Sequence, residues 1–167
     1  YNKAFKTHTK KYEEWLKCVS EKKNGCKVNS SQLLPRELVH PLNSFYFSST
    51  DLCDFKLIEE QWKSMIANQP KMFDKCLAIP DVSGSMNTCL KSDKATMMDV
   101  SISLAILISE LSTEPYKNSV VSFSESPHFI RFDPNDTLKA KIDKIKTEGT
   151  GFNTDINKVF ELLLSGE

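Results

Sequence analysis

Residues 76 to 86 read Cys-Leu-Ala-Ile-Pro-Asp-Val-Ser-Gly-Ser-Met, a short apolar run followed by a polar turn. The run has the length of a buried strand, and Gly84 allows the chain to fold tightly after it. Asp81, Ser83 and Ser85 then share one turn, where a carboxylate and two hydroxyls can face the same point. Mg²⁺ takes one or two carboxylates and keeps several waters. The turn therefore predicts a site for Mg²⁺ or Mn²⁺ that can accept one more carboxylate from a partner.

This motif resembles the metal-ion-dependent adhesion site (MIDAS) of von Willebrand factor A (vWA) domains, whose first element is Asp-x-Ser-x-Ser after the first strand. The second element of that family is a Thr in a later loop, just before a helix. Residues 151–155, Gly-Phe-Asn-Thr-Asp, resemble this element. The resemblance implies a metal site formed by Asp81, Ser83, Ser85 and Thr154. A third element, an Asp after the fourth strand, has no counterpart in this sequence, so we expect the site to be incomplete.

A second resemblance covers nearly the whole chain. It is to an uncharacterised family of plants, fungi and giant DNA viruses, whose members have a helical N-terminal part and a vWA-like C-terminal part. Six blocks occur in the order of that family: Leu33–Val39, Glu59–Trp62, Asp81–Met86, Leu107–Leu111, Val121–Pro127 and Asn153–Phe160. The resemblance implies an α/β chain in which a helical segment, residues 1–70, precedes the first half of a Rossmann-like vWA domain, residues 71–167.

The periodicity of apolar residues predicts where the helices and strands lie. We expect helices at residues 1–23, 55–68, 97–111, 137–146 and 154–163, with an irregular segment of short helices between residues 26 and 55. Asp136 is the expected cap of the helix at 137–146. The inward residues expected on the helix at 97–111 are Val100, Leu104, Leu107, Ile108 and Leu111.

Three strands are expected, at residues 76–80, 119–124 and 128–132, the last at an edge. The first two enclose the helix at 97–111, which is the right-handed crossover of a parallel sheet. A vWA sheet has more strands than these. We therefore expect the chain to be a fragment that pairs with another chain or segment to complete the sheet, or aggregates.

Composition is that of a globular protein, with 40% apolar and 26% charged residues. The 22 basic residues balance the 22 acidic ones, so there is no bulk attraction for nucleic acid. We find no membrane-spanning or signal segment. The five cysteines are odd in number and scattered, which predicts a reduced state and a cytoplasmic location, or the virion or host cytoplasm for a viral protein.

The predicted function is metal-dependent binding of a protein partner that supplies an acidic residue. In a doubly wound sheet, ligands gather beyond the carboxyl ends of the strands, where the four predicted ligands would lie. No catalysis is expected, because Ser83 lies in no Gly-x-Ser-x-Gly motif and no phosphate-binding glycine loop is present. A plainer interpretation is that the motif only joins a strand to a helix, with Thr154 as a cap and Asp155 as a first-turn acid.

Two other functions stay open. The Thr154-Asp155 pair resembles Ro-type RNA-binding proteins, which implies an RNA-binding scaffold. Its polyanion-binding residues would be Lys10, Lys11, Lys22, Lys23, Lys139, Lys141, Lys144 and Lys146. The usual interpretation of such lysines is a solvated outward face. The other function is that of a structural or virion-associated protein with a vestigial metal site.

Overall fold

The computed structural model describes residues 2–21, 23, 25, 26, 28–30, 32–43, 52–70, 73–91, 94–149 and 155–165, without the side chains of residues 2–9, 52 and 53. The chain divides into two compact units. Unit 1 comprises Tyr1–Leu33 and Ser48–Asn68, and unit 2 comprises Leu34–Phe47 and Gln69–Glu167. The domain boundary near residue 70 stays a prediction, and the structure adds that residues 34–47 group with the C-terminal part.

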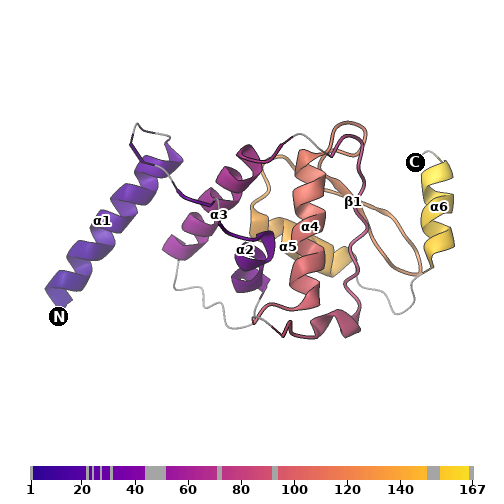
Figure 1. Ribbon diagram of the computed structural model, residues 1–167, viewed down its shortest axis with the longest axis horizontal. Coiled ribbons are helices and arrows are strands. Elements are labelled where there is room, and N and C mark those ends of the chain that lie inside the picture. The colour runs from indigo at the N-terminus through magenta and orange to yellow at the C-terminus, as the bar shows by residue number, and fades with distance from the viewer. Residues whose placement is uncertain are drawn as a thin grey trace. The chain divides into compact units, whose positions relative to one another are not determined.

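Unit 1 is built from two packed helices, α1 (Asn2–Ser20) and α3 (Leu52–Ala67) (Figure 1). Its buried side chains recur at intervals of three and four residues, as one face of a helix requires: Leu16, Val19, Ile58, Trp62 and Met65. Both predicted helices are therefore confirmed, α3 starting three residues earlier than expected.

Unit 2 contains the remaining helices and the strands described (Figure 1). In chain order these are α2 (Pro35–Asn43), the short 3₁₀ helix η1 (Gly84–Asn87), α4 (Met97–Leu111), β1 (Ser119–Val121), β2 (Phe129–Arg131), α5 (Leu138–Glu148) and α6 (Ile156–Ser165). Six of these elements contribute apolar core side chains with no exposed surface, namely Val39, Ile102, Ile106, Val120, Val121, Ile130, Ile142, Ile145 and Val159. α4 packs against α2, and both contact α5.

The bounds of α4 are those predicted, and it is buried on most of its circumference. Of the predicted inward set, only Leu107 is buried, while Leu104 is 44% exposed and Val100, Ile108 and Leu111 are half-buried. The helix predicted at residues 137–146 is confirmed as α5, but the predicted cap, Asp136, is wrong. The cap is Thr137, whose hydroxyl accepts a hydrogen bond from the Ala140 amide at 3.2 Å, whereas the Asp136 carboxylate accepts from the Asp133 amide in the preceding turn.

The sheet of the described residues has two strands, β1 and β2, which pair antiparallel with Val120 opposite Ile130. The strand predicted at residues 76–80 is wrong. Only Ala78 forms a bridge, parallel to Val120, and its carbonyl accepts from the Val121 amide at 3.0 Å. Pro80 has no amide hydrogen and so cannot extend a ladder. The described part is a mixed α/β structure that is mostly helical.

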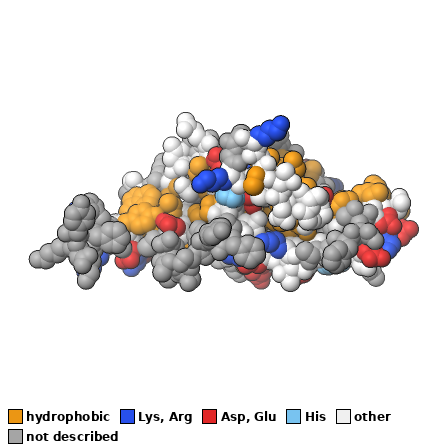
Figure 2. All heavy atoms as spheres, turned by 90° about the horizontal axis from the view of Figure 1, so that it is seen from below, with side chains coloured by type: hydrophobic (Ala, Val, Ile, Leu, Met, Phe, Trp, Pro, Cys, Tyr) orange, Lys and Arg blue, Asp and Glu red, His pale blue; other side chains and the backbone are white. Residues whose placement is uncertain are grey.

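α6 exposes a row of apolar side chains. Ile156, Phe160 and Leu164, spaced four residues apart, are 45%, 58% and 86% exposed, while Val159 on the opposite side is buried. Figure 2 shows apolar side chains at the surface toward the right, where α6 lies in Figure 1. Pairing with another chain or segment stays a prediction. None of the described helices is both long and apolar enough to cross a membrane.

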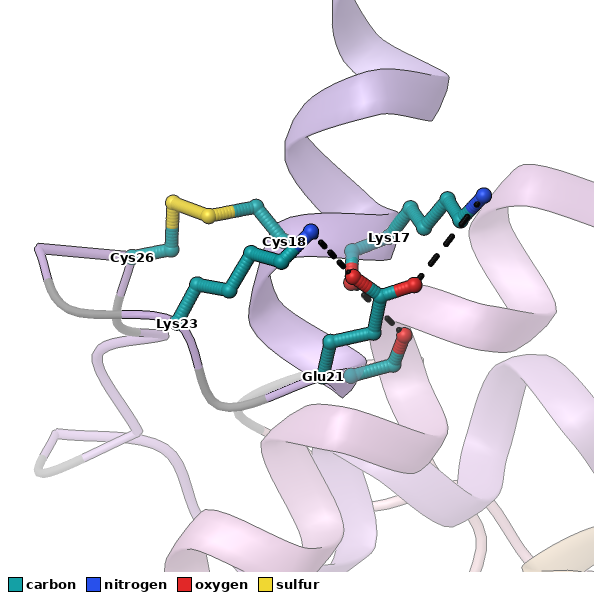
Figure 3. Close-up of a disulfide and its surroundings, with 6 residues drawn as sticks. Lys17, Cys18, Glu21, Lys23 and Cys26 are labelled. Atoms are coloured by element: carbon teal, nitrogen blue, oxygen red, sulfur yellow. Dashed lines mark hydrogen bonds and ion pairs between the residues drawn. A yellow bond between two sulfur atoms is a disulfide. The ribbon is translucent and has the colours of Figure 1, made fainter.

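Cys18 and Cys26 form a disulfide in unit 1 (Figure 3). The prediction that all cysteines are reduced is therefore wrong for this pair, while Cys76 and Cys89 are free thiols. Counting the cysteines could not reveal the bond, because an odd total of scattered cysteines favours free thiols. The pair is close because Cys18 lies in the last turn of α1 and the chain reverses just after it.

Candidate functional site

The turn after residue 80 brings three of the predicted ligands together. Asp81 Oδ1 accepts a hydrogen bond from the Ser83 amide at 2.9 Å, and the Ser83 and Ser85 hydroxyl oxygens are 3.0 Å apart. Asp81 and Ser83 are half-buried, and Ser85 is exposed. One carboxylate and two hydroxyls therefore share one accessible turn, as the sequence predicted.

The neighbours of these ligands hold the turn in place. Pro80 and Val82 are buried, so alternate residues point inward while Asp81 and Ser83 point outward. Val82 packs against Gly149, where a Cβ would come within 3.1 Å of the valine methyl and 2.5 Å of the Ile145 carbonyl oxygen. The end of α5 thus supports the turn from inside, which leaves its polar side free.

Two other segments of unit 2 lie toward this edge. Because the chain at Ala78 runs parallel to β1, Asp81 and Ser122 leave the bridge in the same direction. Residues after β1 are in turn joined to the start of α6, since Lys158 Nζ donates to the Glu125 carbonyl oxygen at 2.9 Å. The first turn of α6 is therefore joined to the loop after β1, and the chain that leads to the Asp81 turn runs beside β1 in the same direction.

The fourth predicted ligand, Thr154, lies outside the described residues. Its neighbour Asp155 directly precedes α6, and its Oδ1 accepts from the Asn157 amide at 3.0 Å. Asp155 is thus a helix cap, whereas the plainer interpretation made it an acid of the first turn. Among the residues described, no group of three His, Cys, Asp or Glu side chains could hold a metal ion. A cation at the turn would therefore rely on one carboxylate and on hydroxyls.

A serine, a histidine and an acid lie close together at the β1–β2 hairpin, which sequence reasoning missed. Ser122 Oγ is 3.0 Å from His128 Nδ1, and His128 Nε2 is 3.8 Å from a Glu148 carboxylate oxygen. Ser122 has no exposed surface, and its hydroxyl also accepts from the His128 amide at 3.0 Å. A buried hydroxyl committed to the hairpin cannot meet a substrate, so this group stabilises the turn between the strands.

The lysines of α5 are bonded within the chain. Lys141 is buried and donates to Glu110 at 2.8 Å, so its predicted outward position is wrong. Lys144 donates to the Arg131 carbonyl oxygen at 2.6 Å, Lys146 donates to Asn43 at 2.7 Å, and Lys139 pairs with Asp143. These contacts compete with polyanion binding by α5.

The lysines predicted for polyanion binding in unit 1 are divided. Lys10 and Lys11 are exposed on α1, while Lys23 pairs with Glu21 at 2.5 Å. Lys22 lies outside the described residues.

Asp99 is the most heavily bonded buried acid described, and it too was missed. It is 1% exposed, and it accepts from Asn43 Nδ2 at 2.6 Å, His40 Nδ1 at 2.7 Å and the Thr96 amide at 2.8 Å. The spacing Thr96-x-x-Asp99 matches a capping box and could have revealed the cap. The partners from α2 could not be found in this way. This network joins the last turn of α2 to the first turn of α4.

We expect Asp99 to make unit 2 sensitive to acid. Burial alone would raise the pKa of Asp99, but the hydrogen bonds from Asn43, Thr96 and His40 outweigh it and leave the pKa below its ordinary value. Folding thus favours the charged form of Asp99. Its contribution to the free energy of unfolding is fully present above the ordinary pKa of about 3.9 and is lost as pH falls through the folded pKa. Chemical denaturation between pH 7 and pH 3 should show that the free energy of unfolding declines below about pH 4. The Asp99→Asn variant should lack the part of this decline that is due to Asp99. An equal pH dependence of unfolding for the wild type and the variant would contradict the prediction.

Comparison with known proteins gives two matches. A family model described as a domain of unknown function (DUF7788) matches residues 75–166. The uncharacterized protein L728 of Acanthamoeba polyphaga mimivirus is 31% identical over 155 residues, which cover 92% of this chain and 24% of the relative. The chain thus spans about a quarter of the length of that relative. No solved structure matches.

Proposed function

The chain belongs to the DUF7788 family, and from that premise we propose that it acts as a metal-dependent protein-binding module of the vWA type. The ion would be Mg²⁺ or Mn²⁺, held by Asp81, Ser83, Ser85 and Thr154. An acidic side chain of a partner protein would complete the coordination. The proposal applies to the 167 residues of this chain, which span about a quarter of the length of the mimivirus relative.

The observation that carries the proposal is the turn from Asp81 to Ser85. Its two hydroxyl oxygens are 3.0 Å apart beside a carboxylate that is half-buried yet accessible. A site with one carboxylate among neutral oxygens leaves the ion with positive charge to spare, which favours an additional carboxylate from outside. The same scarcity of charge predicts weak binding of the ion alone.

The surroundings of the turn support the vWA part of the proposal. The run ending at Pro80 lies parallel to β1, with α4 between them in sequence, as in the crossover expected at a vWA metal site. Asp155, next to the fourth predicted ligand, caps α6, and Lys158 of α6 contacts the loop after β1.

Calorimetric titration with MgCl₂ or MnCl₂ tests the site. We expect saturable binding at about millimolar concentration, since a hydroxyl-rich site with few charges binds weakly. Asp81→Ala should abolish this binding because it removes the one carboxylate. Ser83→Ala should weaken it, because one neutral ligand is lost.

Asp133→Ala is a matched control. Asp133 Oδ1 accepts from the amide two residues later at 2.8 Å, as Asp81 does, but Pro134 and Asn135 follow it in place of hydroxyl residues. This variant should bind the ion as the wild type does. Unchanged titration curves for Asp81→Ala would mean that the motif is only a turn, and the proposal would fail.

A further inference from the structure

The disulfide of unit 1 joins the end of α1 to the loop that follows it (Figure 3). We define the disulfide loop as residues 18–26, of which 18–21, 23, 25 and 26 are described. In Figure 3 the Lys23 side chain extends from this loop to Glu21, and Lys17 approaches the same carboxylate from α1. Both ion pairs are exposed, with 66% of the Lys23 side chain and 76% of the Lys17 side chain accessible. Such pairs contribute little to holding a loop in place.

The disulfide loop forms one wall of a pocket of about 640 Å³. Lys23, Gly25 and Cys26 line it from the loop. Glu60 and Ser64 line it from α3, together with residues at the end of that helix. The shape of the pocket thus depends on where the loop lies against α3.

Hydrogen bonds also hold described residues of the loop and of the segment after it. Within the loop, the Lys23 amide donates to the Cys18 carbonyl oxygen at 3.1 Å, and the Cys26 amide donates to Lys23 at 3.2 Å. Toward α3, the Ser64 hydroxyl contacts the Val28 carbonyl oxygen at a long 3.4 Å. Ser30 Oγ is buried and has no hydrogen-bond partner among the described residues, which is unfavourable for the docked position. The covalent bond is therefore the strongest described constraint on this segment.

We propose that the Cys18–Cys26 disulfide is a redox-sensitive tether that keeps the pocket formed, and that a dithiol reductant releases it. A thiolate of the dithiol attacks one sulfur, the S–S bond breaks, and the other cysteine leaves as a thiolate that takes up a proton. The second thiol of the reductant then resolves the mixed disulfide and frees the remaining cysteine. Two electrons and two protons pass to the protein, and the dithiol becomes a disulfide.

Hydrogen exchange of the full chain, air-oxidised or treated with dithiothreitol, tests the tether. Reduction should speed exchange of peptides from residues 18–30 about tenfold or more, because opening the loop no longer works against the cross-link. Peptides from α4 in unit 2 should exchange at the same rate in both states. Tryptophan fluorescence adds a second measurement, since Trp15 and Trp62, the two tryptophans of the chain, both lie in unit 1. The midpoint of unit 1 unfolding that the fluorescence reports should fall on reduction.

Two variants separate this tether from other thiol effects. Cys18→Ser combined with Cys26→Ser should resemble the reduced wild type and should not respond to dithiothreitol. A chain that keeps only Cys18 and Cys26, with Cys53, Cys76 and Cys89 each replaced by serine, should keep the full response. Equal exchange of residues 18–30 in both states would overturn the proposal. So would alkylation of Cys18 and Cys26 in the oxidised protein, since the bond would then not form.

Discussion

Replacing Asp99 by alanine is expected to lower the free energy of unfolding of unit 2 by about 3 to 5 kcal/mol, the usual cost of breaking a buried charged network. The substitution leaves Asn43 Nδ2, His40 Nδ1 and the Thr96 amide without their acceptor, at 2.6, 2.7 and 2.8 Å respectively. It also removes half of the capping box at the start of α4. Urea denaturation followed by circular dichroism measures the loss, and hydrogen exchange of α4 assigns it to unit 2.

Asp143→Ala is the control for this prediction. Asp143 also pairs with a basic residue, Lys139, but its side chain is 54% exposed. An exposed pair contributes at most about 1 kcal/mol, so this variant should unfold close to the wild type. Similar losses for the two variants would show that the network around Asp99 contributes no more than a surface ion pair.

Replacing Lys141 by alanine is expected to cost about 3 kcal/mol, because it leaves Glu110 as a partly buried acid without this cation. The two side chains are 7% and 16% exposed, and they approach to 2.8 Å. The stem of Lys141 also packs inside unit 2, so its removal loses apolar contacts as well. Urea denaturation measures the effect, with Lys139→Ala as a control on the same helix, since the Lys139 side chain is 34% exposed.

A double variant distinguishes the ion pair from the packing. Lys141→Met together with Glu110→Leu replaces both charges by apolar groups of similar size, which is often neutral or stabilising. It should therefore recover most of the stability lost in Lys141→Ala. If Lys141→Ala unfolds like Lys139→Ala, the buried pair is not formed in solution, and the outward position expected from sequence would be correct after all.

The lysines of α5 show where sequence reasoning reached its limit. Their spacing correctly placed a helix, because apolar residues at Leu138, Ile142 and Ile145 define one face. The same pattern placed Lys141 outside, since it ignores what approaches from elsewhere in the fold. α4 supplies Glu110 from 31 residues away, which makes burial of the lysine possible.

The strands show a different limit. The apolar run at residues 76–80 resembles a strand in composition, yet a ladder also needs amide hydrogens at the right positions, and Pro80 lacks one. β1 was predicted through Ser124 but ends at Val121, because Ser122 and Ser124 direct their hydroxyls to the hairpin turn. Side-chain hydrogen bonds of this kind compete with strand pairing and are not visible in a hydrophobic pattern.

Local features of this protein followed from the order of its residues. The helices and the turn from Asp81 to Ser85 depend on neighbours a few positions apart, so apolar spacing, Gly84 and the serine hydroxyls were sufficient to predict them. The partners of Asp99 on α2 lie 56 and 59 residues away, and Glu110, the partner of Lys141, lies 31 residues away. Such contacts exist only after α2, α4 and α5 have packed together. Burial then makes each polar group require a partner, and it is the packing that selects which residue supplies it.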